Sequence, residues 1–268
     1  MAIFDCFQYF DEDHILDIRF NILDQYVDYF VISESTKTHQ GKNKKLNFNI
    51  DNFTKYKNKI IYVIAENKDH NEIILNHKGG ESIIEQNQRN ALTKGLQKAN
   101  SEDLIILSDS DEIPDLSKLN QIQKNKKFIC FSQKTFMYKL NLQNISESDW
   151  KGSRITKMKY LSTPQGLRNI KFKNYPFWRF DKKNLQIIEG GWHFSYLHSP
   201  EKIKNKILSF SHGEFNKPNF TNLSNIQNRI EAGRDIFERG HELKKVQIDS
   251  SFPAYIIENQ KKLSQWII

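Results

Sequence analysis

The sequence predicts an α/β fold in which a mixed, mostly parallel central sheet is flanked by helices. Strand-like apolar runs alternate with helical segments as far as residue 114, which is the pattern of a doubly wound sheet. The run Leu104–Leu107 is apolar throughout, as expected for a strand buried on both faces. The acidic stretch Ser108–Glu112 follows at once, and the carboxyl ends of parallel strands are where open α/β sheets bind ligands.

The elements of the first half can be justified in order. Apolar runs predict three strands before the central one, at Ile3–Tyr9, Val27–Ser33 and Ile60–Ile64. Asp11 and Asp13 can cap a helix after the first strand. Its apolar face at helical spacing consists of Ile15, Ile18, Ile22 and Leu23. Glu81–Asn100 is the clearest helix, and Gly95 on its apolar face predicts close packing on the sheet.

Weaker patterns cover the second half. Phe128–Leu140 alternates apolar and polar residues over its latter part, as a half-exposed antiparallel strand would. Thr163 and Pro164 begin a short helix that we expect to reach Ile170. The other expected elements are strands at Ser153–Tyr160 and Leu185–Ile188 and helices at Glu201–Phe210 and Asn222–Arg239.

Three carboxylates lie within four residues after the central strand, those of Asp109, Asp111 and Glu112. Their mutual repulsion must be offset, and a divalent cation with oxygen ligands, Mg²⁺ or Mn²⁺, does this well. An Asp-x-Asp pair can hold the diphosphate of a sugar nucleotide through such an ion. The alternative is an acidic turn that leads into a helix at Pro114 and Asp115.

A second informative stretch is Glu189–Tyr196. The paired glycines Gly190 and Gly191 let the backbone approach a ligand closely. Trp192 offers a flat face of the kind that stacks on a sugar, and His193 can ligate a metal or donate a hydrogen bond. A lone histidine is more often structural, so the residues by themselves leave both interpretations open.

Composition limits the partners. The formal net charge of +8 and the pI near 9.2 favour acidic partners, although a solvated lysine surface explains them better than any specific patch. The runs Lys42–Lys45 and Lys124–Lys127 lack interleaved aromatic residues, so no nucleic acid is expected. Cys6 and Cys130 lie in apolar runs and indicate core packing in a reducing compartment. With no signal peptide or membrane-length run, we expect a cytoplasmic protein, with peripheral contact to a membrane left open.

Five short motifs, taken together, resemble glycosyltransferase family 17. They occur in the expected order over roughly residues 1–240, at Phe4–Phe10, Val31–Ser35, Gln88–Asn90, Ser108–Pro114 and Gly191–Tyr196. Animal members of this family add the bisecting N-acetylglucosamine to N-glycans. The resemblance implies a GT-A-like fold, a nucleotide-sugar donor with UDP-N-acetylglucosamine as the default, a divalent metal ion, and inversion at the anomeric carbon.

The resemblance also implies roles for particular residues. Asp111 is the expected direct metal ligand, with Asp109 and His193 beside it. The donor is expected to lie near Phe7, Glu34, Arg89, Asn90, Asp109 and Ser110. Candidates for the base that deprotonates the acceptor are Glu189, then Glu214, then Glu112, and Trp192 is expected to stack on the acceptor sugar. Arg89 by itself could equally be the partner of Glu85 in an ordinary ion pair.

We expect one glycosyltransferase domain over residues 1–268. Residues 1–125 form its donor-binding α/β half, residues 126–240 its acceptor side and residues 241–268 a C-terminal cover. The animal enzymes have a membrane anchor and a luminal stem that this sequence lacks, and Phe194 stands where they tend to have cysteine. A microbial or viral glycan, such as a lipid-linked saccharide, is therefore the more plausible acceptor.

Other classes of protein remain as alternatives. A sugar-phosphate nucleotidyltransferase would use the same acids and release pyrophosphate, and an aspartyl phosphatase also begins with a strand and D-x-D, usually nearer the chain start. A non-catalytic sugar- or nucleotide-binding module is the third. Dinucleotide oxidoreductases and P-loop enzymes are disfavoured because the sequence contains neither G-x-G-x-x-G nor G-x-x-x-x-G-K-[ST].

Overall fold

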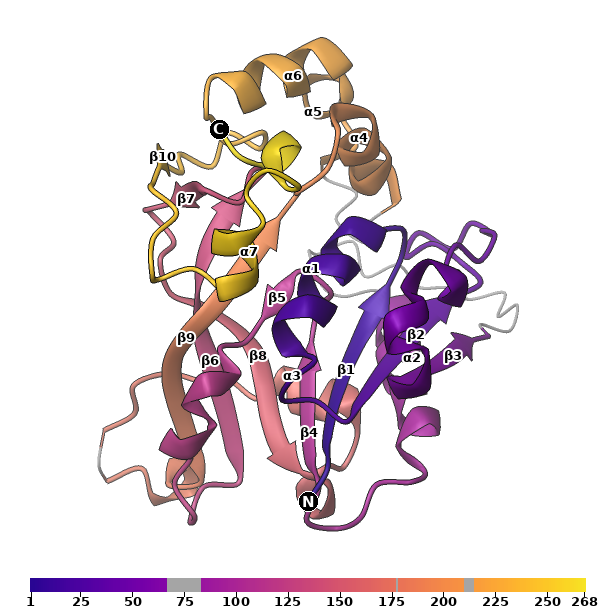
Figure 1. The fold of residues 1–268 in the computed structure, drawn as a ribbon, viewed down its shortest axis with the longest axis vertical. Coiled ribbons are helices and arrows are strands. Elements are labelled where there is room, and N and C mark those ends of the chain that lie inside the picture. Colours follow the sequence, from indigo (N-terminus) through magenta and orange to yellow (C-terminus); the bar gives the residue numbers. More distant parts are fainter. Residues whose placement is uncertain (67–82, 177, 210–214) are drawn as a thin grey trace.

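The computed structural model describes residues 1–66, 83–176, 178–209 and 215–268. These residues form a ten-stranded sheet in the order β10-β7-β6-β8-β4-β1-β2-β3, and β9 joins it beside β6 while β5 pairs with β9 (Figure 1). The strands are β1 Ile3–Tyr9, β2 Tyr29–Ser35, β3 Ile60–Ala65, β4 Leu104–Ser108, β5 Glu112–Ile113, β6 Phe128–Met137, β7 Leu142–Asn144, β8 Trp150–Lys157, β9 Leu185–Ser195 and β10 Leu243–Lys245.

The first half of the sheet follows the prediction. β3, β2, β1 and β4 are parallel neighbours in that order, and β4 is buried along its whole length. Beyond β4 the pairing with β8 is antiparallel, whereas β6 and β9 are parallel over a long stretch. Parallel pairs register more residues than antiparallel ones, so the mixed, mostly parallel sheet is confirmed.

Two strands of the second half differ from the prediction. β6 is buried almost throughout rather than half-exposed, because β8 and β9 flank it and Phe252 packs on Phe136 with ring centroids 5.3 Å apart. β9 extends to Ser195, beyond the predicted end at Ile188. Its glycines serve the fold: Gly191 has φ +107, and a Cβ there would lie 2.5 Å from the Ile113 carbonyl oxygen. The predicted close approach is therefore to the protein's own backbone.

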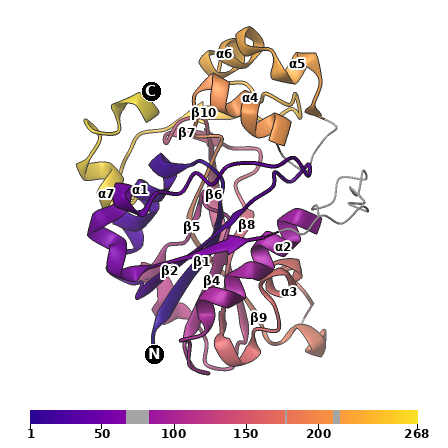
Figure 2. The same ribbon diagram turned by 90° about the vertical axis from the view of Figure 1, so that its right-hand side faces the viewer.

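Helices cover both faces of the sheet, with α1 and α7 on one side and α2 and α3 on the other (Figure 2). Large apolar clusters fill the space beneath each pair, and a third cluster joins α4 and α6 to the end of β6. The helices are α1 Asp13–Leu23, α2 Ile83–Ala91, α3 Pro164–Asn169, α4 Pro200–Ser209, α5 Pro218–Thr221, α6 Leu223–Glu231 and α7 Ala254–Glu258.

Two predicted helices are shorter than expected. The helix predicted over Glu81–Asn100 is α2 followed by a 3₁₀ turn at Leu92–Leu96. Gly95 does pack closely on the sheet, since a Cβ there would lie 2.3 Å from Val31 Cγ1. The helix predicted from Asn222 ends at Glu231, and Gly233 turns the chain with φ +61. No helix in the described ranges is long and apolar enough to cross a membrane.

Candidate functional site

The acidic turn lies at the carboxyl end of β4, as predicted, and a buried arginine fixes its shape. Arg19 of α1 is fully buried. Its Nη1 donates to the carbonyl oxygens of Asp109 and Ser110 at 3.3 Å and of Glu112 at 2.6 Å. Its other nitrogens donate to both carboxylate oxygens of Asp5, at 2.7 and 2.5 Å. Arg19 therefore holds three carbonyls of one turn in place, and Asp5 balances its charge.

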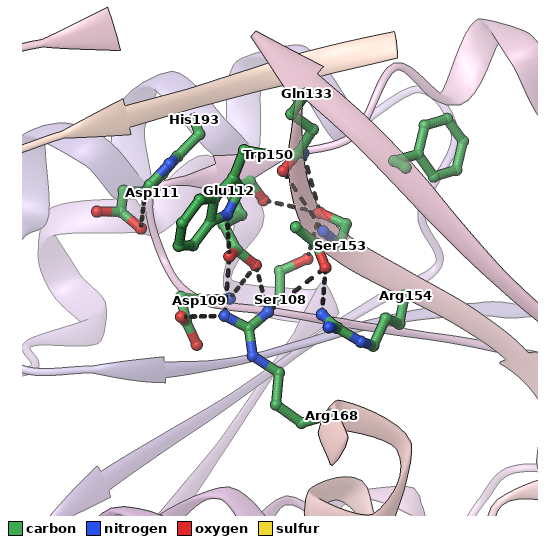
Figure 3. Close-up of polar contacts among 12 residues, drawn as sticks. Ser108, Asp109, Asp111, Glu112, Gln133, Trp150, Ser153, Arg154, Arg168 and His193 are labelled. Carbon is green, nitrogen blue, oxygen red and sulfur yellow. Dashed lines mark hydrogen bonds and ion pairs between the residues drawn. The ribbon is translucent and has the colours of Figure 1, made fainter. Parts of the chain in front are cut away.

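Two of the three acids are neutralised by the protein itself (Figure 3). Arg168 of α3 contacts Asp109 at 2.7 Å and Glu112 at 2.9 Å, and Arg89 lies 3.4 Å from Asp109. Trp150 Nε1 donates to Glu112 at 2.7 Å. Desolvation raises the pKa of both carboxyls, but the surrounding cations together outweigh it, Arg168 foremost with Arg89 and His193, and hold each pKa below its usual value. Protein cations thus offset much of the repulsion that the sequence assigned to a metal ion.

Asp111 is placed differently from the other two acids. Its carboxylate accepts no hydrogen bond from the residues that the structure describes, and its cationic neighbours lie farther away. His193 Nε2 is 3.7 Å from Oδ1, and Lys206 Nζ is 3.7 Å from Oδ2. Burial raises the pKa of Asp111, although Lys206 and His193 oppose this shift. Of the three acids, Asp111 is therefore the one whose carboxylate has no hydrogen-bond donor among the described residues, although the side chain of Asp109 is the more exposed (36% against 13%).

His193 is presented to Asp111 by the pairing of β9 with β5, in which it lies opposite Glu112. Its ring stacks on Trp150 with centroids 4.6 Å apart and an interplanar angle of 25°. Nδ1 is buried and has no partner within the described part of the chain. A carboxylate oxygen and an imidazole nitrogen 3.7 Å apart are donors that suit Mn²⁺, so Asp111 and His193 fit the predicted metal ion.

Lys206 brings a buried positive charge to the same place. Its Nζ lies 3.7 Å from Asp111 and 3.7 Å from Glu12. Burial lowers the pKa of Lys206, but the surrounding acidic groups together, Asp111 first and then Glu12, outweigh it and raise the pKa above its usual value, so the amine stays charged. The sequence placed this residue in a basic amphipathic helix without indicating that it faces the acids.

A cavity of about 220 Å³ opens on these groups. It lies where the end of β1, α2, the acidic turn, β9 and α4 meet. Four of the predicted site residues line it, namely Asp109, Ser110, Asp111 and His193. The lining residues to which the sequence assigned no role include Gln8, Tyr9, Glu12, Gln88, Trp150, Tyr196 and Lys206, of which Gln8, Tyr9, Gln88 and Tyr196 lie within the five motifs.

Phe7 and Glu34 do not line this cavity. Phe7 is fully buried in the core under Arg19, whose guanidinium lies 4.6 Å from the ring centroid. Side chains alternate along a strand, so the neighbouring Gln8 lines the cavity instead. Glu34 is also fully buried, and it accepts hydrogen bonds from the backbone of residues 47 and 48 at 2.8 and 3.0 Å. Glu34 therefore fixes the loop that contains residues 47 and 48 and does not face the cavity.

Arg89 and Asn90 lie behind the cavity. Arg89 pairs with Glu85 at 3.0 Å, as the ordinary ion-pair interpretation allowed, but it is buried and reaches on to Asp109 at 3.4 Å. It also donates to Gln165 at 2.6 Å. Asn90 accepts a hydrogen bond from the Gln165 backbone at 3.0 Å. Both residues therefore anchor α3, which carries Arg168, to α2, and Arg89 also reaches the acidic turn.

The structure does not bring Glu189 and Trp192 to Asp111. They line a second cavity, of about 770 Å³, formed with Asp149, Tyr255 and other residues. Trp192 adjoins His193 in β9, and successive side chains of a strand point to opposite faces. Its indole nitrogen donates to the Ser251 carbonyl at 3.1 Å. β9 thus separates Trp192, the predicted stacking residue, and Glu189, the first predicted base, from the acidic turn.

The other two candidate bases stand differently. Glu112 is fully buried, and both of its carboxylate oxygens are engaged by Arg168, with Trp150 as a further donor. A carboxylate held by these donors is poorly placed to take a proton from an acceptor. Glu214 lies outside the described residues.

Comparison with known sequences identifies the family. A sequence model of glycosyltransferase family 17 matches residues 1–244. The chain belongs to glycosyltransferase family 17. The resemblance carried by the five motifs is confirmed, and this family 17 chain is a glycosyltransferase by membership.

Other comparisons add little. No curated protein matches the chain at a significant level. Among solved structures, HddC from Yersinia pseudotuberculosis has 13% identity and a TM-score of 0.31, with 73% of this chain and 89% of that chain covered. HddC complexed with GMP-PN has the same identity and coverage and a TM-score of 0.29. Likenesses this weak establish neither a fold nor an activity.

Proposed function

We propose that this family 17 chain is an inverting, metal-dependent transferase of the GT-A type. It moves a sugar, by default N-acetylglucosamine, from a nucleotide-sugar donor to a glycan or lipid-linked saccharide. The observation that supports this most is the position of Asp111. It lies at the carboxyl end of β4, 3.7 Å from both His193 and Lys206, on the cavity that the acidic turn lines.

In this proposal Asp111 and His193 would hold Mn²⁺ or Mg²⁺. The ion would supply Lewis-acid stabilisation of the charge that develops on the departing diphosphate. Lys206 adds a second positive charge beside it, and a cation fixed in a buried site stabilises such charge more strongly than one in water. Arg168 and Arg89 keep Asp109 ionised and position the turn, while Trp150 supports the His193 ring.

Inversion requires one base and no covalent intermediate. The acceptor hydroxyl loses its proton to a carboxylate as its oxygen attacks the anomeric carbon, and the bond to the diphosphate breaks on the opposite face. Of the predicted bases, Glu189 faces the second cavity and Glu112 is engaged by Arg168. Glu214 is therefore our proposed base. Ser209, five residues before Glu214 in the sequence, is the last residue of α4 and lines the first cavity.

We further propose that residues 1–125 bind the donor, residues 126–240 the acceptor, and residues 241–268 cover the domain. The sheet supports a single domain, because it runs without interruption through both halves. UDP-N-acetylglucosamine is the first donor to test, as the default of the family.

The experiment measures the nucleotide released from a panel of UDP-, GDP- and CMP-linked sugars, with Mn²⁺ and with chelator. We expect metal-dependent release of a nucleoside diphosphate from one donor, or of CMP if the donor is CMP-linked. Release of pyrophosphate from a nucleoside triphosphate and a sugar phosphate would instead assign a nucleotidyltransferase. A folded protein that neither hydrolyses nor binds any donor would contradict the proposal.

The choice of base has its own test. Glu214→Gln should lower sugar transfer at saturating acceptor by about a hundredfold or more, because general-base catalysis contributes roughly 10²–10⁴. Glu189→Gln is the matched control and should leave transfer within a few-fold of wild type. The assignment is wrong if Glu189→Gln alone abolishes transfer while donor binding persists in both variants.

A further inference from the structure

A separate surface combines exposed aromatic rings with clustered cations. Apart from Met1, Trp178 (61% exposed) and Phe180 (73% exposed) are the most exposed large hydrophobic side chains among the described residues. Both belong to residues 178–183, which with residues 171–176 lie between α3 and β9, at the end of the molecule away from α4–α6 (Figure 1). Exposed apolar groups rimmed by polar ones are typical of interaction sites.

Several side-chain contacts hold the residues on either side of these rings. Phe172 is buried, with Arg154 over its ring at 5.9 Å. The Tyr175 hydroxyl donates to the Lys171 carbonyl at 3.0 Å, and Arg179 contacts the Tyr175 ring at 5.6 Å. A 3₁₀ turn at Phe180–Lys182 completes the tip.

Arg179 and Lys182, close neighbours of the two rings in the sequence, line a cavity of about 390 Å³ with a strong positive charge. The cationic side chains that line it are those of Lys126, Lys173, Arg179, Lys182 and Lys183. The described lining residues include no carboxylate. Asp181 lies nearby and contacts Arg179 at 2.8 Å and Lys182 at 3.4 Å, so one negative charge faces five positive ones.

The fold assembles this charge from two distant parts of the sequence. Lys126 belongs to the run Lys124–Lys127, which the sequence alone left as a solvated surface. Its Nζ donates to the Lys183 carbonyl at 2.9 Å, and the Lys127 backbone donates to the Asn184 carbonyl at 2.9 Å. The turn before β6 therefore lies against the segment before β9, and lysines of both line the same cavity.

We propose that this basic-aromatic patch, consisting of the five cavity cations with Trp178 and Phe180, docks the protein on an anionic membrane surface. Tryptophan and phenylalanine insert favourably at the headgroup level, and lysine and arginine are attracted to anionic lipid phosphates. A soluble anion would engage the cations but leave both rings in water. A lipid surface satisfies the rings and the cations together, and this combination favours it.

Docking is separable from the proposed chemistry. The patch lies at the amino ends of β6 and β9, and the acidic turn lies at the carboxyl end of β4, which runs in the same direction as β6. β6 has 10 residues and so spans roughly 30 Å. Loss of membrane binding and loss of donor turnover can therefore be told apart.

The test is co-sedimentation with vesicles of phosphatidylcholine alone and of phosphatidylcholine mixed with phosphatidylglycerol. The wild type should bind the anionic vesicles, less so as salt increases, and bind the neutral ones weakly. Lys182→Glu/Lys183→Glu should weaken binding at least tenfold, since each cation near the surface contributes about fivefold. Lys244→Glu/Lys245→Glu makes the same change in net charge on exposed residues of β10 and should have a much smaller effect.

The aromatic part has an independent readout. Trp178→Ala/Phe180→Ala should lose vesicle binding while keeping donor turnover without vesicles, and the tryptophan emission of the wild type should shift to the blue on anionic vesicles but not in Trp178→Phe. Failure of the wild type to bind, or equal weakening by the two lysine pairs, would overturn the proposal. So would binding of soluble glycerophosphate without vesicle binding, which would assign the cavity to a free phosphate ester.

Discussion

At the scale of single residues, three neighbouring acids have three different environments. Arg168 is shared by Asp109 and Glu112, whereas Asp111 has cationic neighbours only at 3.7 Å. In the sequence the three carboxylates look equivalent. In the fold, Asp109 and Glu112 are paired with arginine, whereas the carboxylate of Asp111 accepts no hydrogen bond from the described residues. Arg168 comes from a helix 56 residues farther along the chain than Glu112, so no local pattern could indicate it.

Removing Arg168 should therefore affect stability more than any surface arginine. Arg168→Gln leaves the fully buried Glu112 without its cation and should lower the free energy of unfolding by about 3 kcal/mol. Denaturant unfolding at pH 7 measures this. Arg179→Gln, which breaks the exposed pair with Asp181, is the control and should give no resolvable change. Equal effects of the two substitutions would contradict the assigned role.

Asp109 and Glu112 also predict how the stability of the protein depends on pH. The folded-state pKa of Asp109 and of Glu112 is lowered, so each contributes stability above its usual pKa of about 4 and loses it as the pH falls through the folded value. The difference in stability between wild type and Arg168→Gln should be largest near neutral pH and shrink in acid. A difference that stays constant with pH would mean that Arg168 acts through packing alone.

At the scale of elements, the site depends on how helices are fastened to the ends of strands. Arg19 ties α1 to the acidic turn, and Arg89 with Asn90 ties α2 to α3. Gly95 lets the turn after α2 lie directly on β2, because a Cβ would meet Val31 at 2.3 Å. These contacts fix the position of the acidic turn, which is followed by only a two-residue strand, β5.

Arg19 offers a test that separates stability from positioning. Arg19→Met should destabilise the protein by about 3–5 kcal/mol, because Asp5 is left buried without a partner. Adding Asp5→Asn should recover part of that stability but not donor turnover, since the carbonyls of the acidic turn still lack their donor. Full recovery of turnover in the double variant would show that Arg19 only balances the charge of Asp5.

The close packing of Gly95, in the turn after α2, on β2 can also be tested. Alanine normally favours a helical turn over glycine, yet Gly95→Ala should destabilise by about 1–3 kcal/mol through overpacking against Val31. Thermal unfolding of Gly95→Ala with and without Val31→Ala measures it. The second substitution removes the clashing Cγ1 and should offset part of the loss. A stabilised single variant would refute the close contact.

The elements also show how far the sequence could predict the structure. Apolar runs predicted β1–β4 within two residues at each end, because buried strands carry their own signal. The end of the clearest helix was missed because Leu92–Leu96, which includes Gly95, forms a 3₁₀ turn instead. Trp192 and His193 share one motif but face different cavities, because a single residue along a strand reverses the face.

At the scale of the whole molecule, the candidate site lies where segments from both halves of one sheet converge. β1, α2 and the acidic turn come from the first half, and β9 and α4 from the second. The sequence predicted Asp109, Asp111 and His193 because motifs carry them. Lys206 and Trp150 have no such motif and reach the site only through the tertiary fold.

This arrangement makes one measurement decisive for the central claim, that Asp111 holds a metal ion and a donor diphosphate. It is a calorimetric titration of Mn²⁺ in the presence of UDP, for the wild type, Asp111→Asn and Asp115→Asn. Asp115 caps the next turn through the Ser117 backbone, and asparagine caps equally well, so Asp115→Asn is a matched control.

The account predicts that the wild type and Asp115→Asn bind Mn²⁺ and UDP together, each strengthening the affinity for the other. Asp111→Asn should bind Mn²⁺ at least about tenfold more weakly, because even residues behind metal ligands contribute that much. Equal Mn²⁺ affinity in Asp111→Asn and wild type, with both proteins folded, would contradict it.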